Sequence, residues 1–247
     1  MRKLLLLGLV ASVLASCIET AAPVESKPVA SVSQGAANLD QAILNYRRVS
    51  ARVEPVAEQV CRSFHRDKPA TFCDFQIVVR NAPNEPANAF QGIGKDGRPV
   101  ITFNSNMLLQ VQNDDELAFV LGHEAGHQIA SHLIQSRNNQ MAGALILGIL
   151  VAAGGGNADA GIDLGAQIGG RAYSKKFELQ ADSIGAHIAD RAGYNAERGA
   201  QELARTGGSS NWLSTHPSSG ARVANVENVV AEIHASKAAG NIAPIHW

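Results

Sequence analysis

LGHEAGHQIASH, residues 121–132, contains the pattern His-Glu-x-x-His, formed by His123, Glu124 and His127. On an α-helix, positions i and i+4 lie on one face, so the two imidazoles project together at a spacing that suits one tetrahedral Zn²⁺ ion. Glu124 lies one residue further round and can take a proton from a water on the metal as a general base. Because so short a pattern also arises by chance, a genuine site requires a helix, a third ligand and a suitable compartment.

The residues before this pattern predict the helix that the site requires. Asn113 is a favourable N-cap, Glu116 follows three residues later, and Asp114 and Asp115 suit the positive end of the helix dipole. We therefore expect the pattern to lie on a helix.

A catalytic zinc ion takes three protein ligands and leaves one position open. The longer pattern His-Glu-x-x-His-x-x-Gly-x-x-His is excluded, because Ala130 and Leu133 occupy its Gly and last His positions. His132 follows His127 by five residues, so on a continuous helix it points away from the metal face. For His132 we expect a supporting or surface role and not ligation.

A glutamate on a later helix is the other common third ligand. YSKKFELQADSIGAHIADRAGY, residues 173–194, predicts a helix from Ser174 to a C-terminal Gly193, with Glu178 and Asp182 on one face. Glu178 can bind the metal, and Asp182 can accept the free N–H of a ligand histidine. Taken alone, Glu178 fits a surface residue as well. Asp182 favours the metal site, because a carboxylate in this largely apolar stretch needs a partner.

The first residues predict export and a lipid anchor. A basic start, MRK, precedes an apolar run at residues 4–14 that is short for a membrane helix, and LASC follows. This arrangement is typical of a bacterial lipoprotein signal at residues 1–16 with lipidation of Cys17, and an ordinary secretory signal is the alternative. Ile18, in place of Asp, favours the outer membrane, with the protein facing the periplasm.

Residues 17–37 are expected to form the lipidated cysteine and a flexible tether, because they are rich in Ala, Ser, Pro and Val and lack periodicity. A catalytic domain is expected at 38–247. It contains Cys61 and Cys73, and an even pair in an exported protein predicts a disulfide, with two buried free thiols as the alternative.

Apolar periodicity and turn residues predict the other helices and strands. Apolar residues at helical spacing from residue 39 to residue 64 predict a helix, and CDFQIVV predicts a strand. NAFQGIGKDGRPVITFN predicts a hairpin with strands near 89–93 and 100–104. The uncharged run 141–156 predicts a hairpin helix that is buried in the core or faces a membrane, and we favour the core. With a net charge of −1 and no basic patch, the chain has no predicted nucleic-acid partner.

Three segments together resemble the gluzincin zinc metallopeptidases of the CAAX prenyl protease and HtpX family, and most of all its periplasmic, BepA/LoiP-like lipoprotein branch. They are NAF…ITFNSNMLL…DELAFVLGHEAGHQIASH, YSKKFELQAD…AGY and THPSSGAR, in the family's order between Asn88 and Arg222. Lys175 departs from the family, in which Arg often follows the serine. The resemblance implies an α+β fold: a mainly helical, zincin-like metallopeptidase domain with a small β-sheet whose edge strand precedes the active-site helix.

The same resemblance implies one Zn²⁺ per chain, bound by His123, His127 and Glu178, with Glu124 as the base. It also implies an edge strand, here Val100–Asn104, that binds the substrate by β-addition. Such pairing suits unfolded or misassembled envelope proteins as substrates, because backbone hydrogen bonds depend little on side chains.

The segment THPSSGAR adds His216 and Arg222. Relatives carry a His-Pro here, and a neutral imidazole is a competent fourth zinc ligand, so His216 is expected to act as a gate; a surface histidine is the alternative. Arg222 is expected to anchor this gate or to stabilise an oxyanion. The competing function is a periplasmic chaperone or binding module with a structural or vestigial metal site. Glu124 favours the enzyme, since a structural zinc ion needs no base.

Overall fold

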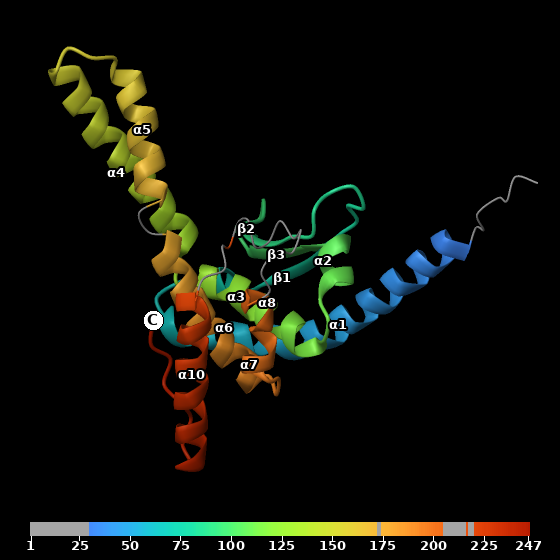
Figure 1. Ribbon diagram of the computed structural model, residues 1–247. Coiled ribbons are helices and arrows are strands. Elements are labelled where there is room, and N and C mark those ends of the chain that lie inside the picture. The colour runs from blue at the N-terminus through green and yellow to red at the C-terminus, as the bar shows by residue number, and fades with distance from the viewer. Residues whose placement is uncertain (1–29, 172–173, 205–215, 217–219) are drawn as a thin grey trace, which may run out of the picture.

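The computed structural model describes residues 30–171, 174–204, 216 and 220–247 (Figure 1). A three-stranded sheet lies beside a set of helices, so the expected α+β fold is confirmed. The elements are α1 (Ala30–Phe64), the 3₁₀ helix η1 (Ala70–Cys73), β1 (Gln76–Arg80), β2 (Ala89–Ile93), β3 (Pro99–Asn104), α2 (Ser105–Gln110), α3 (Asp114–Ile129), α4 (His132–Ala153), α5 (Ala158–Arg171), α6 (Ser174–Arg191), α7 (Ala196–Gly199), α8 (Gln201–Ala204) and α10 (Gly220–Ala238).

The first helix begins within the segment expected to be a tether. Residues 30–37 are helical, because no proline follows Pro28 until the helix is well established. The predicted signal and Cys17 lie outside the described residues.

A disulfide joins the last turn of α1 to η1. It links Cys61 to Cys73, which confirms the predicted pairing. On the chain-entropy model, a loop this short contributes about 3 kcal/mol by restricting the unfolded chain.

The small sheet has the strand order β1-β3-β2. The predicted hairpin is confirmed: β2 pairs antiparallel with β3, and Gly97 in the turn has a φ of +80°. However, β1 pairs in parallel with the other side of β3, so β3 is the central strand. The prediction that Val100–Asn104 forms the edge is therefore wrong, and β2 is the edge strand that precedes α3.

Glycines bring α3 and α6 into backbone contact. A Cβ atom on Gly122 would lie 2.9 Å from the carbonyl oxygen of Gly185, and one on Gly126 would lie 2.9 Å from that of Ala181. Larger side chains at these positions would push the helices apart. The two helices that carry the predicted ligands are thus held at the closest separation that the backbone allows.

The helix α6 ends as its sequence predicts. Gly193 has a φ of +88°, the N–H of Tyr194 donates to the carbonyl of Ala189, and the N–H of Gly193 donates to that of Asp190. This left-handed ending turns the chain toward α7. Further along, α10 packs against α6 and buries Val226, Val230 and Ile233.

The run 141–156 does form one arm of a helical hairpin, but the prediction that it lies in the core is wrong. The pair α4 and α5 projects away from the body (Figure 1). Because α5 covers only one side of α4, five large apolar side chains remain between 57% and 70% exposed: Met141, Leu145, Ile146, Ile149 and Leu150. Among the described residues, no helix combines the length and apolar character needed to cross a membrane.

Candidate metal centre

The site is built on the buried helix α3. The side chain of Asn113 accepts hydrogen bonds from the N–H groups of Asp115 and Glu116, so the predicted N-cap is confirmed. Glu116 in turn accepts from the N–H of Gln112, one residue before the expected capping-box partner. Nearly every residue of α3 is buried, which fixes the rotation of the helix and the face that its histidines present.

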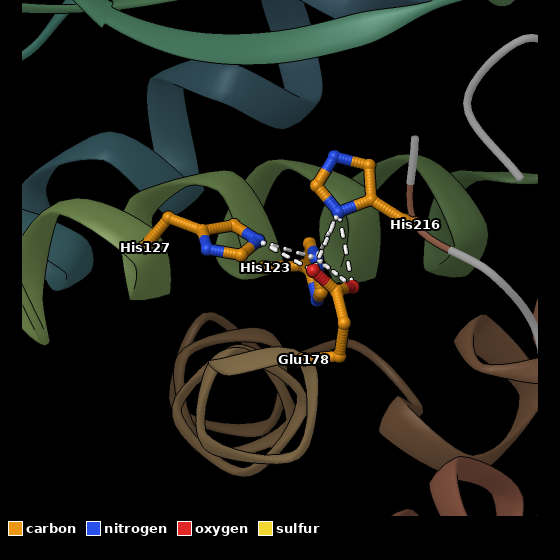
Figure 2. A group of neighbouring side chains, drawn as sticks. All are labelled: His123, His127, Glu178 and His216. Carbon is orange, nitrogen blue, oxygen red and sulfur yellow. Dashed lines mark hydrogen bonds and ion pairs between the residues drawn. The ribbon is translucent and has the colours of Figure 1, made fainter. Parts of the chain in front are cut away.

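Four side chains meet at one point. His123 and His127 project from α3, Glu178 projects toward them from α6, and His216 closes the group from the other side (Figure 2). Each offers one donor atom, and these four atoms all lie within 4.8 Å of one another.

The distances between the donors fit a tetrahedral cation. The Nε2 atom of His123 lies 3.0 Å from Nε2 of His127 and 3.2 Å from Nδ1 of His216. Oxygens of Glu178 lie 3.4 Å from His123, 3.5 Å from His127 and 3.0 Å from His216. Ligands at zinc's usual bond lengths stand roughly 3.3 Å apart in a tetrahedron, so a zinc ion fits among these four atoms.

Asp182 orients His123. Its carboxylate accepts from Nδ1 of His123 at 2.9 Å, so Nε2, which faces the centre of the group, is the atom of His123 that can bind a metal. Arg222, itself buried, donates to both oxygens of Asp182 at 2.6 and 2.7 Å. Asp182 and Arg222 thus hold the Nε2 atom of His123 in place.

Arg222 also reaches the other members of the group. Its Nη1 atom lies 3.1 Å from a carboxylate oxygen of Glu178 and donates to the backbone carbonyl of His216 at 2.8 Å. Through the bond to its backbone carbonyl, the guanidinium anchors His216. This geometry favours anchoring over an oxyanion role, the two functions that the sequence suggested.

Without a metal, the pKa values of His123, His127 and Glu178 are shifted in different directions. Burial disfavours a proton on His123, but hydrogen bonds to Asp182 and Glu178 outweigh burial and raise its pKa to about 9. Burial, followed by the charges of His123 and His216, lowers the pKa of His127 well below its usual value. Burial would raise the pKa of Glu178, yet its hydrogen bonds to His123 and His216 lower it strongly. The cluster therefore favours a positive charge at its centre, which a divalent cation would supply.

His132 is not one of the four donors and contacts the ligand His127, which agrees with the expected supporting role, but the prediction that its side chain points away from the site is wrong. The helix α3 ends at Ile129, and Ser131 adopts a left-handed conformation with a φ of +57° before α4 begins. This break turns His132 back, so that its Nδ1 atom lies 2.9 Å from Nδ1 of His127. The assumption of a continuous helix caused the error. Burial lowers the pKa of His132 to about 4.

Glu124 is buried beside the donors and faces a cleft of about 240 Å³. One of its oxygens lies 3.5 Å from Nε2 of His216. Phe90 and Gln91 of β2 line the same cleft, and Gln91 donates to the side chain of Gln128 on α3. The edge strand is thus fastened next to the candidate base. A larger cavity of about 500 Å³, between α1, α6 and α10, is lined by none of these residues.

A sequence profile of Peptidase family M48 matches residues 47–230 of the chain. The chain belongs to this family. Family M48 consists of metal-dependent peptidases, which agrees with the donor group on α3 and α6 and with the family resemblance of the three sequence segments.

Two relatives illustrate the similarity. The chain is 27% identical over 199 residues to a putative beta-barrel assembly-enhancing protease of Vibrio cholerae, covering 70% of this chain and 39% of that protein. It is 32% identical over 163 residues to the mitochondrial metalloendopeptidase OMA1 of Saccharomyces cerevisiae, covering 62% and 46%. The chain therefore spans less than half the length of these curated relatives.

Proposed function

We propose that this M48 protein is a zinc endopeptidase in which His123, His127 and Glu178 hold the metal and Glu124 is the general base. The observation that carries the proposal is the group of four donor atoms, all within 4.8 Å of one another, beside a buried carboxylate. A set of two histidines and one glutamate suits zinc better than magnesium or calcium, which prefer oxygen ligands. A purely structural zinc ion would not need Glu124, so this residue argues against a binding module with a vestigial site.

The metal ion and the protein side chains supply different parts of the catalytic chemistry. Zinc, when bound, lowers the pKa of water and polarises the peptide carbonyl. Glu124 takes the proton of the attacking water and delivers it to the leaving amine. Asp182 keeps Nε2 of His123 available for the metal, and Arg222 balances the charge of the two carboxylates.

For the substrate we propose an extended segment of an unfolded or misassembled envelope protein. Its backbone would add to the free edge of β2, since β2 pairs with β3 on one side and lines the cleft with Phe90 and Gln91. The lipoprotein-like sequence that ends in Cys17 supports a periplasm-facing protein anchored to the outer membrane.

His216 supports a gate. Its imidazole stands where a fourth ligand or the attacking water would stand, 3.2 Å from Nε2 of His123. Movement of His216 away from the group would open that position. Such a switch requires a free-energy difference of only a few kcal/mol between the two arrangements. His216→Ala should keep zinc and raise the basal cleavage of an unfolded protein. A loss of activity would instead assign His216 to the transition state, and wild-type values would remove the gate.

The decisive experiment separates the base from the ligands. Glu124→Gln should retain one zinc ion per chain and lose at least about 100-fold in cleavage of an unfolded protein, because it removes the base alone. Glu178→Ala should lose both zinc and cleavage, whereas Glu197→Ala, at an exposed position on α7, should lose neither. Full cleavage by Glu124→Gln would overturn the proposed mechanism, and stoichiometric zinc in Glu178→Ala would place the third ligand elsewhere.

A further inference from the structure

The hairpin of α4 and α5 has two unlike sides. The large exposed apolar side chains of α4 beyond Arg137, here named the outer face, are Met141, Leu145, Ile146, Ile149 and Leu150. The opposite side of α4 contacts α5 at Gly161, where an added Cβ would lie 2.7 Å from the carbonyl oxygen of Leu147 and 2.9 Å from Cβ of Val151. On α5, Asp159 and Asp163 are exposed, and helical spacing places them opposite Gly161, which meets α4.

The hairpin is therefore amphipathic as a unit. Its outer face carries only aliphatic and thioether side chains, and its far side carries two carboxylates. No charged residue occurs between Arg137 and Asp159. From Met141 to Leu150 the outer face is about 14 Å long at 1.5 Å per residue. A unit of this kind lies in the plane of a membrane surface, with its apolar side among the acyl chains and its charges in water.

We infer that the outer face of α4 rests on the lipid surface. A protein partner is a poorer match, because protein interfaces contain aromatic residues, arginine and about one hydrogen bond per 100–200 Å². The outer face contains only Met, Leu and Ile, which offer none of these. Lipid acyl chains require none of them.

The predicted lipid anchor supports the same occupant. This step rests on the proposed acyl group at Cys17. The stretch from Cys17 to Ala30 can span up to about 45 Å when extended. An acyl group at Cys17 would keep the whole protein, and with it the hairpin, close to a lipid surface.

The test places a fluorescent label on each side of the hairpin. In the full-length protein Cys61 and Cys73 are joined and Cys17 would be acylated, so an introduced cysteine is the reactive thiol. Ile149→Cys and Asp163→Cys, each labelled with an environment-sensitive dye, are reconstituted into phosphatidylethanolamine/phosphatidylglycerol vesicles. The label at 149 should shift to the blue and be quenched by brominated acyl chains, whereas the matched label at 163 should remain in water.

Each other result overturns the inference. A label at 149 that stays in water excludes lipid contact. Equal quenching at 149 and 163 excludes the in-plane orientation. A blue shift that depends on protein concentration without vesicles assigns the face to a second copy. Mass spectrometry of the acylated N-terminus tests the anchor separately, so a failure of the anchor and a failure of the hairpin remain distinguishable.

A different set of contacts carries a second inference. His132 lies between His127 and Gln180: Nδ1 is 2.9 Å from Nδ1 of His127, and Nε2 is 3.0 Å from Oε1 of Gln180. Because an amide oxygen only accepts, Nε2 of His132 carries the hydrogen and its Nδ1 atom is the acceptor. His127 must then donate from Nδ1, which leaves its Nε2 atom free to face Glu178 and His123.

We propose that His132 is a positioning residue for the ligand His127, as Asp182 is for His123. The ring is held for this role, since it is buried and stacks on Phe177 with centroids 4.3 Å apart. The second ligand histidine is thereby oriented by a neutral acceptor in place of a carboxylate. Removal of such a partner weakens metal binding by about 10–100-fold in comparable sites.

Two substitutions separate positioning from packing. His132→Phe keeps a ring on Phe177 but removes the acceptor, so zinc affinity measured by chelator competition should fall by about 10–100-fold. His132→Asn keeps an acceptor near the position of Nδ1 but removes the ring, so it should bind zinc more tightly than His132→Phe while unfolding at a lower temperature. If zinc affinity follows stability in both variants, or if His132→Phe binds zinc as the wild type does, the role is structural and the proposal fails.

Discussion

The interior between α3 and α6 and the outer face of α4 reverse the usual placement of side chains. Between α3 and α6 the carboxylates of Glu178 and Asp182 and the guanidinium of Arg222 are buried, whereas the five large apolar side chains of the outer face are exposed. In the first region each charge has partners at hydrogen-bond distance, so burial is tolerable. In the second, several exposed apolar side chains lie close together, which is typical of a surface that another apolar medium covers. The comparison teaches that a charged side chain can be buried where it has hydrogen-bond partners. An apolar side chain can face outward where another apolar surface can cover it.

The strongest test of the buried region removes its positively charged arginine side chain. Arg222→Met leaves the carboxylates of Asp182 and Glu178 buried without their shared partner, so the free energy of unfolding should fall by about 3–5 kcal/mol. The control Lys237→Met breaks an ion pair with Asp190 in which the lysine is largely exposed, and should cost less than about 1 kcal/mol. Urea unfolding of the metal-free proteins measures both values. Equal losses would mean that Arg222 does not serve the buried charges.

Two glycine-to-alanine substitutions, one in each region, test how closely the helices pack. In Gly185→Ala the new methyl group would lie 2.8 Å from the backbone nitrogen of His123, so the helices must separate, at a cost of about 1–3 kcal/mol and with weaker zinc binding. In Gly161→Ala it would lie 2.7 Å from the carbonyl oxygen of Leu147 within the hairpin. This second change should destabilise the hairpin and leave zinc affinity within about twofold of wild type. Chelator competition would contradict the separation of the regions if both variants lost zinc equally.

The pH dependence of zinc binding measures the charge balance of the site. In the metal-free protein the pKa of His123 is raised to about 9, so a proton is bound below pH 9 and leaves as the pH rises through that value. Zinc must displace this proton, and its apparent affinity should rise about tenfold from pH 7 to pH 8. Asp182→Asn removes the main cause of the raised pKa and should flatten the profile. A profile as steep as that of the wild type would show that another group controls the proton.

The smallest effect is expected on the hairpin. Ile149→Gln replaces an exposed apolar side chain and should change the free energy of unfolding by less than about 0.5 kcal/mol in solution. Ile184→Gln places the same change in the buried face of α6 and should cost several times more. A large loss in Ile149→Gln would indicate that the outer face is covered by protein even without lipid.

Local chemistry made much of this site predictable. The cap at Asn113, the i,i+4 spacing of His123 and His127, and the disulfide between Cys61 and Cys73 each depend on a few neighbouring residues or on a simple count. The i,i+4 spacing of Glu178 and Asp182 suggested the third ligand, and the family resemblance supported Glu178 and the roles of His216 and Arg222. The structure brings these three residues to the same point.

The rest depended on information that the local pattern does not contain. A hairpin pattern identifies β2 and β3 as neighbours, but it does not show which of them β1 joins, so the edge strand was misassigned. His132 was misplaced because the left-handed conformation of Ser131 has no strong sequence signal in a non-glycine residue. The apolar run in α4 predicts burial without specifying whether protein or lipid provides the cover.

Ser131 also links the direction of α4 to the metal centre. The turn at this residue lies at one end of a helix of 22 residues, which is about 33 Å long. A tilt of about 10° at this end would move the far end by about 6 Å, given that length. The first residue of α4 is His132, whose ring contacts the ligand His127. A displacement of the tip of the hairpin would therefore correspond to a much smaller shift of the imidazole that lies beside the metal site.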